Sequence, residues 1–101
     1  MGRITVADLR ATLARTEKLL RNAGELGPDE VLYVSQEMAG TPWQVFVKRT
    51  HMAGPIAGHP VIGWFGESSW LGRTKADAQR DLRRTNAALI MHLKNTGRPT
   101  E

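Results

Sequence analysis

Apolar residues recur at helical spacing near the start of the chain. A threonine at position 5 with Asp8 three residues later is typical of a capping box, in which side chains and backbone N–H groups satisfy one another at a helix start. Gly24 is a common residue type just past a helix end. The pattern predicts a helix over about residues 6–23. Its apolar stripe consists of Val6, Leu9, Leu13 and Leu20, with Thr16 between them.

The chain then changes from helical spacing to β-branched and alternating residues. The run VLYVSQ (31–36) is rich in residue types that favour strands. In the run WQVFVKR (43–49), Trp43, Val45 and Val47 fall on one face and polar residues fall largely on the other. With turn residues between the two runs, the pattern predicts an antiparallel hairpin with one buried face.

The second half of the chain contains one more apolar run and a second helical pattern. After a Gly/Pro-rich loop over 50–60, the run VIGWFG (61–66) is predicted to be a third short strand. Thr74 with Asp77 three residues later indicates the start of a helix that ends near Lys94 or Asn95. Its apolar stripe consists of Ala78, Leu82, Leu89 and Leu93, flanked by Asn86 and Ile90.

These elements predict an α+β fold with the order helix, three-stranded antiparallel sheet, helix. A small sheet needs a cover on one face, so both helices are expected to pack on the same sheet face. The length predicts one domain, 1–101, with a short lead over 1–4 and a tail over 96–101.

Charge is distributed unevenly along the chain, which has a net charge of +4. Residues 1–24 have a net charge of +3 and residues 25–47 a net charge of −4. Residues 48–70 have +1 and residues 71–101 have +4. Basic ends of this kind favour binding to nucleic acid or to an acidic protein surface. Arginine outnumbers lysine by ten to four, which is also the usage of a GC-rich genome.

Several classes of chemistry have no support in the sequence. The chain has no cysteine, no apolar run of membrane-spanning length and no signal-peptide pattern, so a cytoplasmic protein is expected. His51 and His59 share one loop without a nearby carboxylate, and His92 lies on the second helix, so no metal site is predicted. No catalytic motif is present either, and neither an enzyme nor a cofactor is expected.

The strongest functional candidate is the basic start and side of the second helix. A helix N-terminus offers unpaired N–H groups to a phosphate, and basic side chains add charge. The simpler interpretation is a solvated helix face on which Asp77 and Asp81 pair with neighbouring arginines. Trp70 lies outside the periodic runs and is a candidate aromatic anchor for a partner. The candidate binding residues are Arg73, Lys75, Arg80, Arg83, Arg84 and Trp70.

The order of elements, together with the run GRTKADAQRDL, resembles the double-stranded RNA-binding domain. The resemblance implies that Arg73, Lys75 and Gln79 contact phosphates and that the turn near 40–42 enters a minor groove. Only Lys75 stands where that family has adjacent lysines, and the loop over 50–60 is long for the family. The pattern also resembles HicB-type antitoxins and the arm-binding domains of phage integrases. The whole chain resembles small phage proteins of GC-rich hosts.

Three functional hypotheses follow from these observations. In the first, the protein is a non-catalytic module that contacts duplex DNA or RNA through the second helix. In the second, it is a phage or mobile-element protein that binds and inhibits an acidic host protein or nucleoprotein complex. In the third, it forms a homodimer through the uncovered sheet face.

Overall fold

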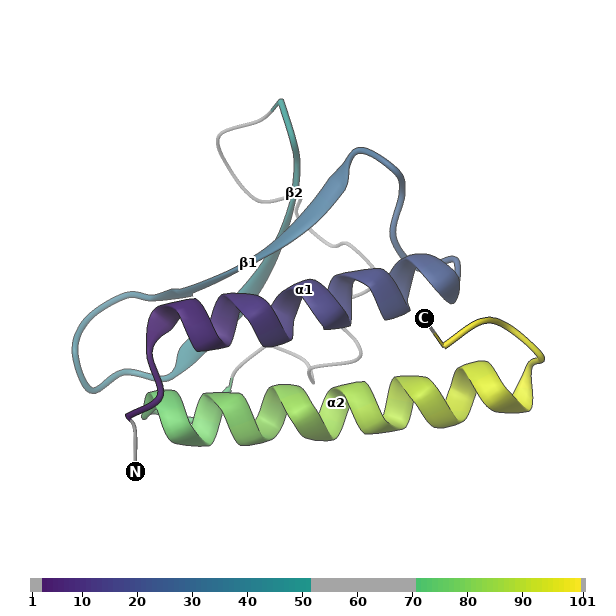
Figure 1. Ribbon diagram of the computed structural model, residues 1–101. Helices are drawn as coiled ribbons and strands as arrows, with labels where there is room; N and C mark the ends of the chain where they lie inside the picture. The colour runs from purple at the N-terminus through teal and green to yellow at the C-terminus, as the bar shows by residue number, and fades with distance from the viewer. Residues whose placement is uncertain (1–2, 52–70, 101) are drawn as a thin grey trace.

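A computed structural model of the chain describes residues 3–51 and 71–100. Both predicted helices are present with nearly the predicted limits, and the two predicted strands of the hairpin are confirmed. Figure 1 shows the described elements in the order α1 (Val6–Asn22), β1 (Glu30–Gln36), β2 (Trp43–Arg49) and α2 (Lys75–Asn95).

The start of each helix is set by a threonine, as the sequence predicts. At α1 the Asp8 N–H donates to the Thr5 hydroxyl over 3.2 Å, and the Thr5 N–H donates to the Asp8 carboxylate over 2.8 Å. This is a complete capping box. At α2 the Asp77 N–H donates to the Thr74 hydroxyl over 3.0 Å. Each cap satisfies a backbone donor that would otherwise lack a partner in the first turn.

β1 and β2 pair antiparallel in a register that places the apolar residues of both strands on one face. Leu32 lies opposite Val47, and Val34 lies opposite Val45. Side chains opposite each other in an antiparallel pair project from the same face of the sheet. Leu32, Val45 and Val47 are buried on that face, together with Trp43. The predicted alternation of buried and solvated positions in β2 is therefore confirmed.

The predicted three-stranded sheet is wrong, because the sheet in the described part of the chain has two strands in the order β1-β2. The run expected to form the third strand, 61–66, lies outside the described residues. Beside the first residue of β2 the chain leading into α2 already pairs with the backbone. The Trp43 N–H donates to the Gly72 carbonyl over 3.1 Å, and the Leu71 N–H donates to the Trp43 carbonyl over 2.7 Å. A run of strand-favouring residues predicts local conformation but not a pairing partner.

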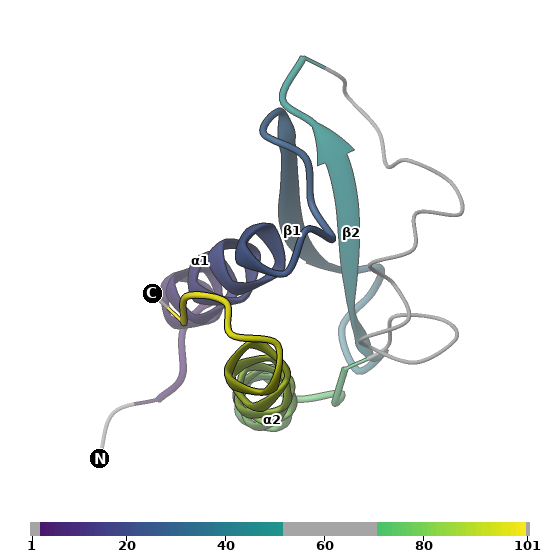
Figure 2. The same cartoon turned by 90° about the vertical axis from the view of Figure 1, so that its right-hand side faces the viewer.

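The two helices run in the same direction, side by side, so their N-termini lie at the same end of the molecule (Figure 1). α1 lies against both β1 and α2. Figure 2, which looks nearly along the helices, shows α1 next to β1 and α2 beside α1. One core joins the helices to the sheet. Its fully buried members include Leu9, Leu19 and Leu20 of α1, Leu82, Leu89 and Leu93 of α2, and Val47 of β2.

The interface between the helices also contains buried polar groups. Thr16 of α1 is fully buried and donates a hydrogen bond to Asn86 Oδ1 on α2 over 2.5 Å. Thr16 also lies 3.1 Å from the Thr12 carbonyl one turn earlier in its own helix. Gln79 of α2 is 6% exposed, and its side-chain oxygen has no hydrogen-bond partner within residues 3–51 and 71–100. The sequence pattern places Thr16 within the first stripe and Asn86 at the flank of the second, but it does not predict that they meet.

The residues after α2 fold back against α1. The Asn22 side chain donates to the Pro99 carbonyl over 3.1 Å, and Arg98 donates to the Asn22 carbonyl over 3.4 Å. Arg15 donates to the Thr100 carbonyl over 3.3 Å. These contacts join the C-terminal end of one helix to the segment that follows the other.

Candidate functional site

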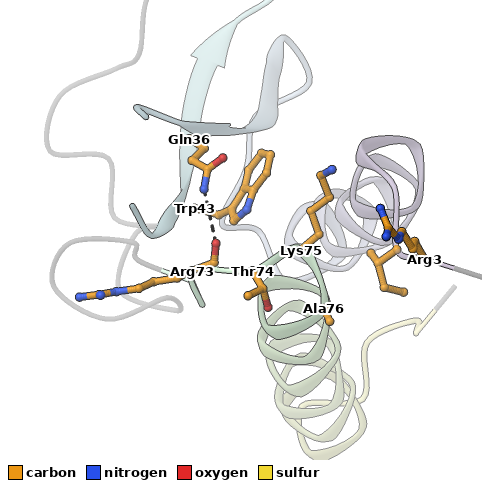
Figure 3. A pocket seen from close by; sticks show the side chains of 8 residues that line it. Arg3, Gln36, Trp43, Arg73, Thr74, Lys75 and Ala76 are labelled. Atoms are coloured by element: carbon orange, nitrogen blue, oxygen red, sulfur yellow. Dashed lines mark hydrogen bonds between the residues drawn. The ribbon is translucent and has the colours of Figure 1, made fainter. Parts of the chain in front are cut away.

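An open hollow of about 680 Å³ lies at the start of α2. Three cationic side chains line it, Arg3 before α1 and Arg73 and Lys75 at the start of α2. Its remaining lining consists of Ile4, Gln36, Trp43, Thr74 and Ala76, so it contains no acidic side chain among the described residues. Figure 3 shows Lys75 and Arg3 on one side of the hollow, whereas the Arg73 side chain extends away from them.

The parallel arrangement of the helices brings these cations together. Arg3 precedes the first turn of α1, and Lys75 begins α2, so both lie at the shared N-terminal end (Figure 3). Unpaired N–H groups and the positive ends of both helix dipoles lie at this end. Gln36 at the end of β1 attaches the hairpin to the same place. Its side-chain nitrogen donates to the Arg73 carbonyl over 3.4 Å and to the Thr41 carbonyl over 2.9 Å.

A glycine allows the chain to approach the start of α2 closely. A Cβ on Gly72 would lie deep inside contact distance of the Asp77 Cβ and 2.9 Å from the Asp77 carbonyl carbon. The Gly72 carbonyl also accepts the hydrogen bond from Trp43. No other residue type fits between the strand and the helix without a shift of backbone. Gly72 therefore helps to position Arg73, the next residue, at the edge of the hollow.

The acidic residues in the first turns of both helices already have partners. Hydrogen bonds from the backbone N–H and the hydroxyl of Thr5 hold the pKa of Asp8 below its usual value, and the charge of Arg83 adds to this effect. Asp77 pairs with Arg80 over 3.5 Å. Both carboxylates are thus engaged in a cap or an ion pair, and neither lines the hollow.

The structure separates the predicted binding residues of α2 into two groups. Arg73 and Lys75 line the hollow. Arg80 follows Lys75 by five residues, which turns the helix by about 140° beyond one full turn and places Arg80 on another side. Arg84 follows Arg80 by four residues and shares that side. The predicted broad basic face is therefore divided between the end of the helix and its outer side.

The predicted ion pairing on the outer side of α2 is present only at Arg80. Its guanidinium lies 3.5 Å from Asp77 and 3.8 Å from Asp81, although its side chain is 62% exposed. Arg83 and Arg84 are exposed and form no ion pair with any residue in 3–51 or 71–100. The solvated-face interpretation accounts for Arg80, and the charge of Arg83 acts on Asp8 of α1, whereas Arg84 has no ion-pair partner among the described residues. Trp70 lies outside the described residues.

Arg3, Gln36 and Trp43 are among the residues that line the hollow but were not predicted as site residues. Arg3 was part of the basic N-terminal segment, but nothing in the local pattern connects it to Lys75. Trp43 was predicted to be a core residue and is 7% exposed, so only its edge reaches the hollow. The parallel packing of the helices places Arg3 beside the start of α2. Hydrogen bonds from the hairpin to residues 71–73 place Gln36 and Trp43 there, and no local pattern specifies either arrangement.

The positive charge is concentrated in the layer of helices. The helix layer, residues 3–24 and 71–100, contains twelve basic and four acidic residues and has a net charge of +8. The sheet layer, residues 25–51, contains two basic and four acidic residues and has a net charge of −2. The two charged layers lie next to each other in the fold (Figure 2). The sequence segments separated by net charge thus correspond to two sides of the molecule.

Two classes of site are not found within the described part of the chain. No group of three or more His, Asp or Glu side chains in residues 3–51 and 71–100 could hold a metal ion. Neither α1 nor α2 is long and apolar enough to pass through a bilayer.

The chain was compared with protein-family models, curated proteins and solved structures, and none of them matches it. The order of helix, hairpin and helix is compatible with the layout of the double-stranded RNA-binding domain but does not identify that family.

Proposed function

We propose that the protein is a small binding module that holds the phosphates of duplex nucleic acid with its helix layer. The observation that carries this proposal is the hollow at the shared N-terminal end, which is lined by Arg3, Arg73 and Lys75 and by no acidic residue among its described lining. Phosphate contacts supply most of the affinity of non-specific nucleic-acid binding. The net charge of +8 on the helix layer supports the same proposal.

The geometry suggests how the module would engage a duplex. Lys75 and Arg3 would contact one phosphate group at the helix N-termini, where N–H groups and helix dipoles favour an anion. Arg73, whose side chain extends away from Lys75 and Arg3, would contact a neighbouring phosphate. Such contacts position a protein on the duplex without reading bases. Binding with little sequence preference is therefore expected.

Fluorescence anisotropy with labelled duplex DNA and duplex RNA over a series of salt concentrations tests the proposal. The double variant Arg73→Ala/Lys75→Ala should bind more weakly than the unaltered protein. Its slope of log affinity against log salt should be shallower by about 2, since each lost phosphate contact removes about 0.9 from the slope. A comparison of the two duplexes shows which nucleic acid is preferred.

Arg80→Ala is the matched control, because Arg80 lies on the same helix but is paired with Asp77 and Asp81. It should change the affinity and the slope little. The proposal is refuted if the unaltered protein binds neither duplex at low salt. It is also refuted if Arg80→Ala lowers the slope as much as the double variant.

A further inference from the structure

A second hollow, of about 360 Å³, lies on the outer side of α2 and is lined mainly by apolar side chains. Its lining consists of Ala87, Ile90, Met91 and Lys94. The spacing of these residues by three, four and seven places them on one side of the helix. Met91 is 65% exposed, whereas Ile90 packs partly against the core. The hollow therefore has a floor attached to the core and an exposed apolar side chain at its rim.

Cations lie at both ends of this hollow. Arg83 and Arg84 are about one turn before Ala87, and Lys94 forms the far end. α2 contains no acidic residue after Asp81. The surface consequently combines an apolar centre with positive charge on either side over about three turns of helix.

This combination distinguishes between the candidate ligands. Nucleic-acid phosphates would use the arginines but would gain little from the aliphatic side chains of Ile90 and Met91. An amphipathic helix places apolar side chains at positions i, i+3, i+4 and i+7 in a groove, and its flanking residues contact the rim. Carboxylates at those flanking positions would lie opposite Arg83, Arg84 and Lys94. The charge and shape thus complement an acidic amphipathic helix.

We infer that the side of α2 between Arg83 and Lys94 docks an acidic amphipathic helix of a partner protein. This surface is separate from the hollow lined by Arg3, Arg73 and Lys75. The protein would then connect a nucleic acid at the end of the helix layer to a protein on its outer side. Because the apolar area is small, the contact is weak and transient, as is usual for interfaces well below about 1,000 Å².

The probe is a fluorescein-labelled peptide of about 20 residues, long enough to become helical on binding, with leucine at the i, i+3, i+4 and i+7 positions and glutamate elsewhere. A peptide of identical composition in scrambled order keeps the charge but removes the apolar stripe. The unaltered protein should bind the patterned peptide with micromolar affinity and the scrambled peptide at least about tenfold more weakly.

Met91→Gln should weaken binding of the patterned peptide by about tenfold, because it removes the exposed apolar side chain and keeps a good helix former. Met38→Gln is the matched control, since Met38 is also 65% exposed but lies in the turn between the strands. It should leave the affinity unchanged. Circular dichroism should show that both variants remain folded.

Duplex binding separates this inference from the proposed function. Met91→Gln should leave affinity for duplex DNA and RNA unchanged, whereas Arg73→Ala/Lys75→Ala should leave affinity for the peptide nearly unchanged. The inference is overturned if the patterned peptide does not bind, if both peptides bind equally well, or if Met91→Gln and Met38→Gln behave alike. Equal binding of both peptides would show that the surface selects charge only.

Discussion

Thr16 and Asn86 connect the two helices through a buried polar contact. Replacing Thr16 should lower the stability of the protein more than replacing Asn86. The Thr16 hydroxyl carries one proton and has two acceptors within reach, Asn86 Oδ1 at 2.5 Å and the Thr12 carbonyl at 3.1 Å. The Asn86 oxygen accepts its hydrogen bond from Thr16, and the Asn86 nitrogen lies 3.5 Å from the Thr12 carbonyl. If Asn86 is removed, Thr16 can still donate within its own helix. If the Thr16 hydroxyl is removed, the Asn86 oxygen loses its donor.

The magnitude follows from the cost of leaving a buried polar group unpaired. Thr16→Val keeps the shape of the side chain and should lower the free energy of unfolding by about 1–3 kcal/mol. For a chain of this size, that corresponds to a fall in Tm of about 4–8 °C for each kcal/mol. Asn86→Leu should cost less than about 1 kcal/mol, since it replaces a buried amide by an apolar side chain of similar shape. The double variant should be more stable than the sum of the single effects predicts.

Urea unfolding monitored by circular dichroism measures all four proteins of this cycle. Thr85→Val is a matched control, because the Thr85 hydroxyl donates only to the Asp81 carbonyl of its own helix over 3.0 Å. It should change stability little. The reasoning is refuted if Asn86→Leu costs more than Thr16→Val, or if the two effects add without any coupling.

Three further predictions concern single positions. Asp8→Ala should reduce the loss of stability in acid, because the lowered pKa of Asp8 gives a contribution that is complete above the unfolded pKa of about 4 and is lost as pH falls through the lower folded value. The difference in urea midpoint between the two proteins should therefore shrink as pH falls below about 4, and a difference that stays constant with pH would contradict this. Gln79→Met should raise the free energy of unfolding by about 1 kcal/mol, because it removes a buried oxygen that has no partner in the described part of the chain. An unchanged or lower urea midpoint would contradict this. Gly72→Ala should lower Tm and weaken duplex binding together, because the added Cβ meets the backbone of Asp77 and must displace the segment before α2. A fall in Tm with unaltered duplex binding would show that Gly72 does not help to position the binding residues.

The elements that sequence analysis predicted well are those defined by local patterns. Thr5 and Thr74 cap the helices because a threonine hydroxyl can accept a hydrogen bond from the backbone N–H three residues later. This contact is local and does not depend on the rest of the fold. The alternation in β2 predicted the burial of Val45 and Val47 because successive side chains of a strand point to opposite faces. The number of strands could not be predicted in this way, because pairing depends on which edge a segment meets.

The site was predicted only in part for the same reason. Arg73 and Lys75 were found because they adjoin a recognisable helix start. Arg3 was not, since it is at least seventy positions earlier in the sequence and reaches the hollow only through the packing of α1 against α2. The burial of Gln79 was also missed, because glutamine is normally a surface residue and nothing in the local pattern marks it as buried.

The parallel direction of α1 and α2 has a consequence for how the chain folds. Two helices that run in the same direction cannot form a local helical hairpin, so the intervening chain must cross the length of the molecule before they meet. Asn22 and Pro99, which contact each other at the far end, are separated by 77 positions. Contacts of such large sequence separation slow folding, because the entropy of closing the long loop is lost before the contact forms. The β1–β2 hairpin can form early from local contacts, whereas docking of the helices is expected to limit the rate.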